Sequence, residues 1–235
     1  MPHPYVLVER LEAGHLRVAL SRPERRNALD PGMVVALTEA LSADPDAVVV
    51  LGSATPGMFC AGADLSIPDA ERAAVSDLLY DCFELMITRP GPVIAAVGGA
   101  AVGGGVQLAC AADLRVAGPA ARLRWTGPPG AGLAVGAWIL PELVGRGRAL
   151  ELIMSGRWVE AAEAVSLGLA SRVEPDPDQA AAELAGELAR RGGSPFGAAK
   201  TVASTGGLRE RLRAERAVNR AAWQYPGVAQ AGEQG

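Results

Sequence analysis

The sequence predicts an α/β protein in which a β-α core is followed by a helical C-terminal region. The chain has 235 residues, enough for one large domain or for a core with a helical appendage. Hydrophobic residues make up 49% of it, which excludes disorder as the dominant state. Short strand-like apolar runs alternate with helical spacings early in the chain, and helical spacings dominate from residue 147 onward.

The first elements form a predicted hairpin and a capped helix. The runs YVLV (5–8) and HLRVAL (15–20) flank an Ala-Gly turn signal, which indicates two antiparallel strands. Asp30 precedes a proline at the first helical position, which predicts that a helix begins there. Further along we expect, in order, a buried strand at 47–51, a helix at 72–88, and buried strands at 92–97 and 113–117.

The second part of the chain is predicted to be helical. Its spacings indicate helices at 147–155, 160–167, 178–191 and about 207–224. The segment Pro175-Asp176-Pro177 is the best candidate for a hinge, because prolines interrupt regular structure. We therefore expect a core at 1–177 and a C-terminal helical region at 178–235.

The last predicted helix carries a dense cluster of charges. Two glutamates interrupt a run of five arginines: Arg209, Glu210, Arg211, Arg213, Glu215, Arg216 and Arg220. Charge runs of this kind usually form a solvated helix face. We therefore expect these side chains to face solvent or a second subunit.

Charge and cysteine content exclude several classes of protein. The net charge is −4 and Lys200 is the only lysine, so no basic stripe for nucleic acid is expected. The three cysteines lack metal-ligand spacing, which predicts reduced packing thiols and no metal site. No basic-then-apolar leader opens the chain, and no apolar run approaches the ~18 residues of a membrane span. These features predict a soluble cytoplasmic protein.

A glycine-rich stretch, GGAAVGGGVQLACAAD (98–113), leads from an apolar run into a helical pattern. Glycines at a helix start expose backbone N–H groups at the positive end of the helix dipole, where an anion can bind. The alternative is that the glycines only permit tight packing of the helix against a strand. The dinucleotide pattern fails because Leu108 stands where it needs a glycine, and the phosphate-loop pattern fails because no lysine follows.

A second small-residue loop strengthens the first interpretation. FCAGADL (59–65) follows the strand at 47–51 through a Thr-Pro-Gly turn and offers further exposed amides. If the two loops leave neighbouring strand ends, they can direct two N–H donors at one oxygen. Such a pair polarises an acyl carbonyl.

These two loops and two further segments resemble the crotonase superfamily, that is, the enoyl-CoA hydratase/isomerase family. The segments are SRPERRNAL (21–29), FCAGADL (59–65), PVIAAVGGAAVGGGVQLACAADLRVA (92–117) and LVGRGRALELIMSGRWVEAAEAVSLGLASRV (143–173). The resemblance implies a crotonase-like spiral of ββα units with a C-terminal helical oligomerisation region. It also implies a homotrimer, or a hexamer built as a dimer of trimers.

The resemblance further implies an acyl-CoA site, with no cofactor beyond the coenzyme A of the substrate. The backbone amides of Ala63 and Gly104 would form the oxyanion hole for the thioester oxygen. Residues expected along the coenzyme A are Arg25, Arg26, Ala28, Leu29, Ala61, Asp64 and Leu65. Asp64 is expected mainly to cap the following helix, and Asp113 to hold its strand.

The sequence departs from the family's hydratases at both usual catalytic glutamates. Gln107 stands at the first position and Gly127 falls at or near the second, and 114–133 contains no Asp or Glu. A glutamine hydrogen-bonds a water molecule but cannot take its proton. Candidates for a relocated acid are Asp69, Glu71 and Glu142, for which exposed helix-end charges are the favoured alternative.

Two interpretations of function follow. In the first, the protein is a hydratase or isomerase of fatty acid metabolism, a lyase or isomerase with an atypical acid/base. In the second, it is a non-catalytic acyl-CoA-binding or carrier protein on the crotonase fold. Trp125, with Leu123, Leu133 and Trp138, would form an apolar acyl pocket, or these residues would simply pack in the core.

Overall fold

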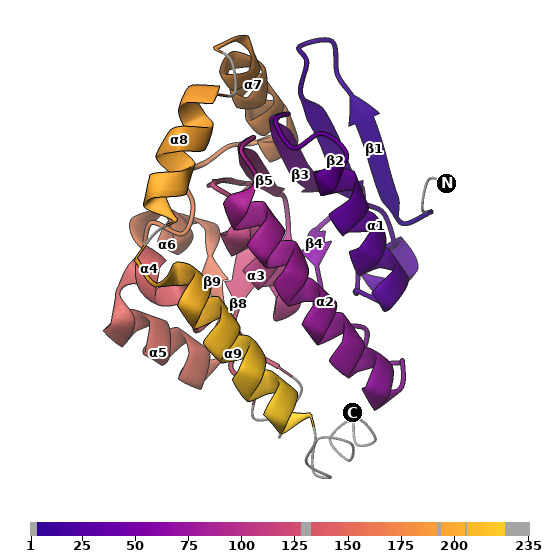
Figure 1. Ribbon diagram of the computed structural model, residues 1–235, viewed down its shortest axis with the longest axis vertical. Helices are drawn as coiled ribbons and strands as arrows, with labels where there is room; N and C mark the ends of the chain where they lie inside the picture. The colour runs from indigo at the N-terminus through magenta and orange to yellow at the C-terminus, as the bar shows by residue number, and fades with distance from the viewer. Residues whose placement is uncertain (1–3, 128–132, 192–193, 205, 224–235) are drawn as a thin grey trace.

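The computed structural model describes residues 4–127, 133–191, 194–204 and 206–223 (Figure 1). Its strands are β1 (Val6–Arg10), β2 (Leu16–Leu20), β3 (Val49–Ser53), β4 (Met58–Cys60), β5 (Val93–Val97), β6 (Ala100–Val102), β7 (Leu114–Ala117), β8 (Arg122–Arg124), β9 (Val159–Glu160) and β10 (Arg172–Val173). Its α-helices are α1 (Pro31–Ser42), α2 (Asp69–Thr88), α3 (Gly104–Ala111), α4 (Leu140–Val144), α5 (Arg146–Ser155), α6 (Ala161–Ser166), α7 (Pro177–Arg190), α8 (Ser194–Ala203) and α9 (Leu208–Ala222).

Successive ββα units place one strand in each of two sheets. The larger sheet has the order β1-β2-β3-β5-β7-β10, and the smaller has β4-β6-β8-β9. The pairs β3–β5 and β5–β7 are parallel, as are β4–β6 and β6–β8. The units β3-β4-α2 and β5-β6-α3 thus repeat along the sheets, with β7-β8 and α4 following in the same order. This is the crotonase-like spiral that the sequence analysis expected.

Both faces of the larger sheet are covered at β3 and β5, which explains the continuous apolar runs of these two strands. Val49 and Leu51 belong to the main core, together with side chains of α1 and α2. The alternate residue Val50 packs with Ile94 against alanines of α7. A strand buried on both faces has no polar side to show as alternation.

The hairpin and the first helix form as predicted. β1 and β2 pair antiparallel, with Val6 opposite Leu20. The Asp30 carboxylate accepts a hydrogen bond of 2.8 Å from Met33 N, so it caps α1, with Pro31 at the first helical position. The predicted long helices and buried strands are found within a few residues of their expected bounds.

The strands β4, β6 and β8 were not predicted. Each has three residues, MFC, AAV and RLR, which is too short to show a period in the sequence. β4 and β6 lie between the strands expected at 47–51 and 92–97 and the two small-residue loops, so the loops follow β4 and β6 directly. Because β4 and β6 are parallel neighbours, both loops leave the same edge of the smaller sheet.

The arginines of α9 pair with acids of the same chain and still form the solvated face that was expected, since Arg209, Arg213 and Arg220 keep half or more of their side-chain surface exposed. Glu215 is the exception, because it is buried. The two helices run side by side (Figure 1). Arg209 and Arg213 pair with Glu84 of α2, while Arg216 and Arg220 pair with Asp77. Arg211 pairs with Glu142 of α4.

The predicted boundary after residue 177 coincides with the start of α7, which Asp176 caps. α7 nevertheless packs on the larger sheet, so only the type of secondary structure changes at this boundary. The division into 1–177 and 178–235 stays a prediction.

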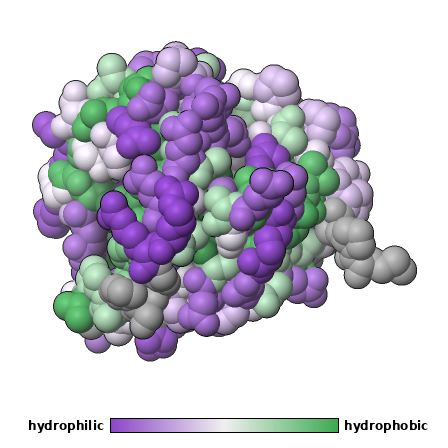
Figure 2. Space-filling model, turned by 90° about the horizontal axis from the view of Figure 1, so that it is seen from above, coloured by the Kyte–Doolittle hydropathy of each residue, from purple (hydrophilic) through white to green (hydrophobic). Residues whose placement is uncertain are grey.

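The surface seen from above carries bands of hydrophilic residues (Figure 2). Within the described parts of the chain, no helix has the length and apolar character to cross a bilayer.

Candidate functional site

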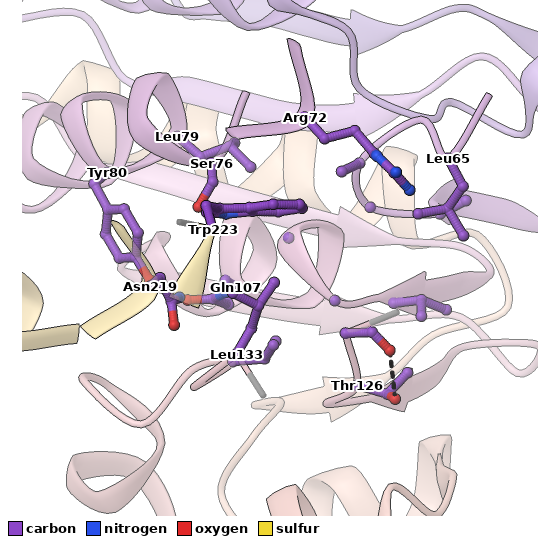
Figure 3. A pocket seen from close by; sticks show the side chains of 18 of the residues that line it. Leu65, Arg72, Ser76, Leu79, Tyr80, Gln107, Thr126, Leu133, Asn219 and Trp223 are labelled. Carbon is purple, nitrogen blue, oxygen red and sulfur yellow. Dashed lines mark hydrogen bonds between the residues drawn. The ribbon is translucent and has the colours of Figure 1, made fainter. Parts of the chain in front are cut away.

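A cavity of about 190 Å³ lies beside the loops that follow β4, β6 and β8. The three strands are parallel neighbours, so their carboxyl ends meet at one edge of the smaller sheet. α2 forms a second wall with Arg72, Ser76, Leu79, Tyr80 and Phe83. Asn219 of α9 and Trp223, the residue that follows α9, close the cavity (Figure 3). A rigid scaffold thus presents loops around a mostly apolar space, which is the usual construction of a binding site.

The three consecutive glycines at the start of α3 have different roles. Gly103 has φ +55° and ψ −120°, a backbone conformation that only glycine adopts readily. A Cβ on Gly105 would collide with the carbonyl oxygen of Cys60, so this glycine serves tight packing. Gly104 lines the cavity, and a Cβ there would lie 2.9 Å from the Leu79 side chain. Of the three glycines, only Gly105 therefore fits the interpretation that the glycines serve tight packing.

Two backbone amides on the cavity wall donate no hydrogen bond among the described residues. Ala63 forms an isolated parallel bridge with Leu29, in which Leu29 N donates to Gly62 O at 2.7 Å and Asp64 N donates to Leu29 O at 2.9 Å. In this pattern the Ala63 N–H points away from Leu29. Gly104 is the first residue of α3, so its N–H has no partner within the helix.

Close backbone contact brings together the two loops that carry these amides. A Cβ on Gly62 would lie 2.8 Å from Val102 O and 3.3 Å from Gly104 N. Gly62 also has φ +86°, so a side chain would be strained there for a second reason. The loop after β4 and the start of α3 therefore touch through bare backbone.

The loop at 22–29 is held against β4 by a buried asparagine. Arg26 and Asn27 both have positive φ, 53° and 56°. The Asn27 side chain accepts a hydrogen bond from Arg22 N at 2.7 Å and donates one to Phe59 O at 2.9 Å. These bonds offset the cost of two successive left-handed residues and fix the loop beside the cavity.

Asp64 joins this loop to the site and does not cap α2. Its carboxylate lies 2.9 Å from Arg22 and accepts hydrogen bonds from the N–H and hydroxyl of Ser66. α2 begins later, at Asp69 after Pro68, so the capping expectation was wrong. Burial acts to raise the pKa of Asp64, but the Ser66 bonds and the Arg22 charge together hold that pKa below its usual value.

The structure brings six of the predicted site residues to the cavity: Ala61, Ala63, Leu65, Gly104, Gln107 and Gly127. The others lie beside it. Arg25 and Arg26 are exposed on the adjacent loop, whose Ala28 and Leu29 are buried, and Asp64 is buried in its ion pair. Trp125 is a correction: it is fully buried behind Gly136 and does not line the cavity.

Of the apolar residues considered with Trp125, Leu133 lines the cavity, while Leu123 and Trp138 are buried in the core. The core alternative therefore holds for three of the four aromatic and aliphatic residues.

Gln107 is fixed by a buried tryptophan. Its Oε1 accepts a hydrogen bond of 2.8 Å from Trp138 Nε1. The Trp138 ring is stacked on Phe83 with 5.6 Å between centroids, and Trp138 N donates to Glu215 at 2.7 Å. Gln107 therefore has one orientation on the cavity wall.

Glu215 of α9 is a buried carboxylate that the sequence analysis placed in a charged helix face. It accepts hydrogen bonds from Gly136 N, Trp138 N and the Tyr80 hydroxyl. Burial raises its pKa to about 7, and these hydrogen bonds limit the rise. Glu215 lies one helical turn after Leu212, which is also buried. This spacing places both side chains on one face of α9, and it was the signal in the sequence that Glu215 could be buried.

Asn219 completes this network one turn further along α9. Its Nδ2 donates to the Tyr80 hydroxyl at 2.7 Å and to Ala134 O at 3.0 Å, and its Oδ1 accepts from Ala134 N at 2.8 Å. Tyr80 and Asn219 both line the cavity. The network ties α9, α2 and the segment at 133–138 together around the site.

None of the candidate relocated acids lines the cavity. Asp69 pairs with Arg72, Glu142 pairs with Arg211, and Glu71 is exposed. Among the described lining residues there is no Asp, Glu or His. Asp113 holds its strand as expected, since its carboxylate accepts from Val93 N at 2.7 Å and pairs with Lys200.

The cysteines are buried packing residues. Burial raises the pKa of Cys60 and Cys82 to about 12 and that of Cys110 to about 11. Thiols with such values are neutral and poor nucleophiles.

The ββα spiral and its cavity define a protein of the crotonase fold, and comparison with known proteins agrees. A family model described as Enoyl-CoA hydratase/isomerase matches residues 10–229. A probable enoyl-CoA hydratase, echA6, of Mycobacterium bovis is 40% identical over 182 residues, covering 74% of this chain and 72% of the relative. A putative enoyl-CoA hydratase of Thermus thermophilus is 40% identical over 195 residues, covering 77% of each chain.

Solved structures show the same similarity. An enoyl-CoA hydratase from Bacillus anthracis superimposes with a TM-score of 0.78 at 30% identity, covering 92% of this chain and 90% of the other. One from Mycobacterium avium subsp. paratuberculosis gives a TM-score of 0.87 at 25% identity and covers 99% of both chains. The chain belongs to the enoyl-CoA hydratase/isomerase family of the crotonase superfamily.

Proposed function

We propose that this chain binds acyl-CoA thioesters, with the thioester oxygen between the N–H groups of Ala63 and Gly104, and does not hydrate them. The observation that carries the proposal is that both amides lie on one cavity wall without an acceptor among the described residues. Two preorganised N–H donors at a helix start stabilise a carbonyl oxygen or an enolate oxygen. The relatives named enoyl-CoA hydratases support the choice of ligand.

The coenzyme A part of the ligand would lie along the loop at 22–29. Leu29 is bridged to Ala63, so this loop continues directly from the amide pair. Arg25 and Arg26 are exposed there and are placed to meet phosphate groups. Raising the salt concentration should therefore weaken acyl-CoA binding more than it weakens binding of the corresponding acyl-pantetheine, which lacks the nucleotide.

The lining does not support hydration. Adding water to an enoyl thioester needs a group that removes a proton from water, and the described lining offers no carboxylate or imidazole. Gln107 cannot fill that role. The alternative, turnover by a group outside the cavity lining, would route a proton through Tyr80 to Glu215.

Calorimetric titration with short, medium and long acyl-CoAs, combined with an optical assay of crotonyl-CoA hydration, tests the proposal. We expect binding without turnover, and at least about tenfold weaker binding in Gly104→Ala, because the added methyl group would lie 2.9 Å from the Leu79 side chain on the cavity wall and take up space that the thioester needs. Gly147→Ala is the control, because that site is open. Hydration abolished by Glu215→Gln would establish the turnover alternative, and absence of any acyl-CoA binding would refute the proposal.

A further inference from the structure

The orientation of the Gln107 carboxamide is determined by its partner. The indole Nε1–H of Trp138 is a donor only, so the atom 2.8 Å from it must be the amide oxygen. Trp138 is fully buried, stacked on Phe83 and held through its backbone N–H, so the ring cannot turn to release the amide. The NH₂ group of Gln107 is therefore the free end of this side chain.

This NH₂ group faces the cavity. Gln107 is 6% exposed and lines the cavity, as Figure 3 shows. Its Nε2 has no acceptor among the described residues, and it is not one of the enclosed side-chain atoms without a partner, so it is reached from the cavity. A buried carboxamide with a free donor at a binding cavity calls for an acceptor on the ligand.

The position of Gln107 places this third donor beside the amide pair. Gln107 follows Gly104 by three residues in α3, so its side chain lies on the same face of the first helical turn. The wall thus carries the N–H groups of Ala63 and Gly104 and, next to them, an NH₂ group. A ligand that satisfies all three has a second acceptor oxygen close to its thioester carbonyl.

The chemistry of the donor narrows the identity of that oxygen. An NH₂ group satisfies a ketone oxygen fully, whereas a hydroxyl in the same place would also need an acceptor for its own proton. A carboxylate there would need a cation whose charge is not already balanced, but the charge of the Arg72 guanidinium at this cavity is balanced by Asp69, although its Nε has no hydrogen-bond partner. A plain methylene group would leave the NH₂ without a partner.

We propose that the preferred ligand is a 3-oxoacyl thioester, whose 3-oxo oxygen accepts from Gln107 Nε2 while its thioester oxygen lies between Ala63 and Gly104. This inference rests on the acyl-thioester site proposed above and names its ligand class. The same three donors would stabilise the enolate of such a 1,3-dicarbonyl, in which both oxygens share the negative charge.

Calorimetric titration with acetoacetyl-CoA, 3-hydroxybutyryl-CoA and butyryl-CoA tests the inference, because these probes share length and coenzyme and differ only at the third carbon. We expect the wild type to bind acetoacetyl-CoA about tenfold more tightly than butyryl-CoA, the effect of one good hydrogen bond. The ultraviolet absorbance of bound acetoacetyl-CoA should also show a larger enolate fraction than in solution.

Two variants of Gln107 and one control distinguish the loss of the hydrogen-bond donor from general damage to the structure of the site. Gln107→Met keeps the length and removes the donor, so the preference should fall to within about twofold. Gln107→Glu keeps an acceptor for Trp138 but turns a carboxylate oxygen toward the ligand, so acetoacetyl-CoA should bind more weakly than butyryl-CoA. Thr126→Val should keep the wild-type preference, because that hydroxyl is bonded to Gly127 O.

Equal wild-type affinities for acetoacetyl-CoA and butyryl-CoA would overturn the 3-oxo assignment and leave the acyl-CoA site standing. A preference for acetoacetyl-CoA that survives in both Gln107 variants would overturn the role of this side chain. Failure of every acyl-CoA to bind would instead refute the site itself.

Discussion

Gly105 and Gly147 are each the second residue of a helix, in α3 and α5, yet their surroundings differ completely. A Cβ on Gly105 would strike the backbone of Cys60, and one on Gly147 would meet nothing within 4 Å. We expect Gly105→Ala to lower the free energy of unfolding by about 1–3 kcal/mol, because backbone cannot move aside as a flexible side chain can.

Gly147→Ala should leave the free energy of unfolding unchanged or raise it by up to about 1 kcal/mol, because alanine loses less backbone entropy in a helix. Urea denaturation of both variants checks the pair. Equal effects at the two positions would mean that the close approach of α3 to β4 is not as the structure has it.

Glu215 makes stability depend on pH in a direction opposite to that of most carboxylates. Burial raises its pKa from 4.5 to about 7, so between these values the folded state binds a proton that the unfolded state does not. Below about pH 4.5 this carboxyl group makes its full contribution to the free energy of unfolding. That contribution, about 3 kcal/mol, is lost as the pH rises from 4.5 through 7.

Urea denaturation at several pH values between 5 and 8, with wild type and Glu215→Gln compared at each, isolates this contribution. The wild type should lose stability relative to the variant as the pH rises, since glutamine does not titrate. Glu210→Gln, at an exposed position of the same helix, is the control and should run parallel to the wild type. If the free energy of unfolding of Glu215→Gln changes with pH in the same way as that of the wild type, the raised pKa of Glu215 is contradicted.

At the scale of elements, α9 is attached to the rest of the chain by two kinds of contact of unequal strength, ion pairs with α2 and hydrogen bonds with the segment at 133–138. Asp77 is about one-third exposed and pairs with Arg216 and Arg220, and such surface pairs each contribute only about 0.2–1 kcal/mol. Asn219 is buried and satisfies both the N–H and the carbonyl of Ala134. Its loss would leave two part-buried backbone groups of Ala134 without these partners.

We therefore expect Asn219→Ala to cost about 1–3 kcal/mol of unfolding free energy and Asp77→Asn less than about 1 kcal/mol. The effect of Asp77→Asn should shrink further at high salt, which screens exposed charges, while that of Asn219→Ala should not. Chemical denaturation at low and high salt measures both. A larger cost for Asp77→Asn would mean that the charged surface holds α9 in place.

For the whole molecule, the cavity is bounded by elements from the core and from α9, so a ligand should stabilise the folded chain as a unit. At about a hundredfold excess over its dissociation constant, an acyl-CoA should add about 2.7 kcal/mol to the free energy of unfolding. Thermal unfolding with increasing acetoacetyl-CoA checks this, with free coenzyme A as the control for the nucleotide alone.

The assembly stays a prediction from the family resemblance. Sedimentation equilibrium should give three or six times the mass of the 24.1 kDa chain. A monomer would show that this chain completes its cavity by itself, with its own Asn219 and Trp223.

Local chemistry allowed much of the molecule to be predicted from sequence. The cap at Asp30, the hairpin and the doubly buried strands β3 and β5 follow from residue type and period, which need no knowledge of distant contacts. The glycine loops are likewise properties of short segments, and the prediction that the usual glutamates are replaced also rests on short segments alone. The family and its spiral fold were therefore accessible from the sequence.

The polar half of the site depended on contacts between distant segments. Tyr80 and Glu215 are 135 residues apart, and Trp138 and Gln107 come from different elements. On α9, Leu212, Glu215 and Asn219 share the buried face, but two of the three are polar, so the helix shows no apolar stripe in the sequence. Burial turned a charged residue of a surface-like helix into a carboxylate that titrates near neutral pH, and burial is a property of the folded chain alone.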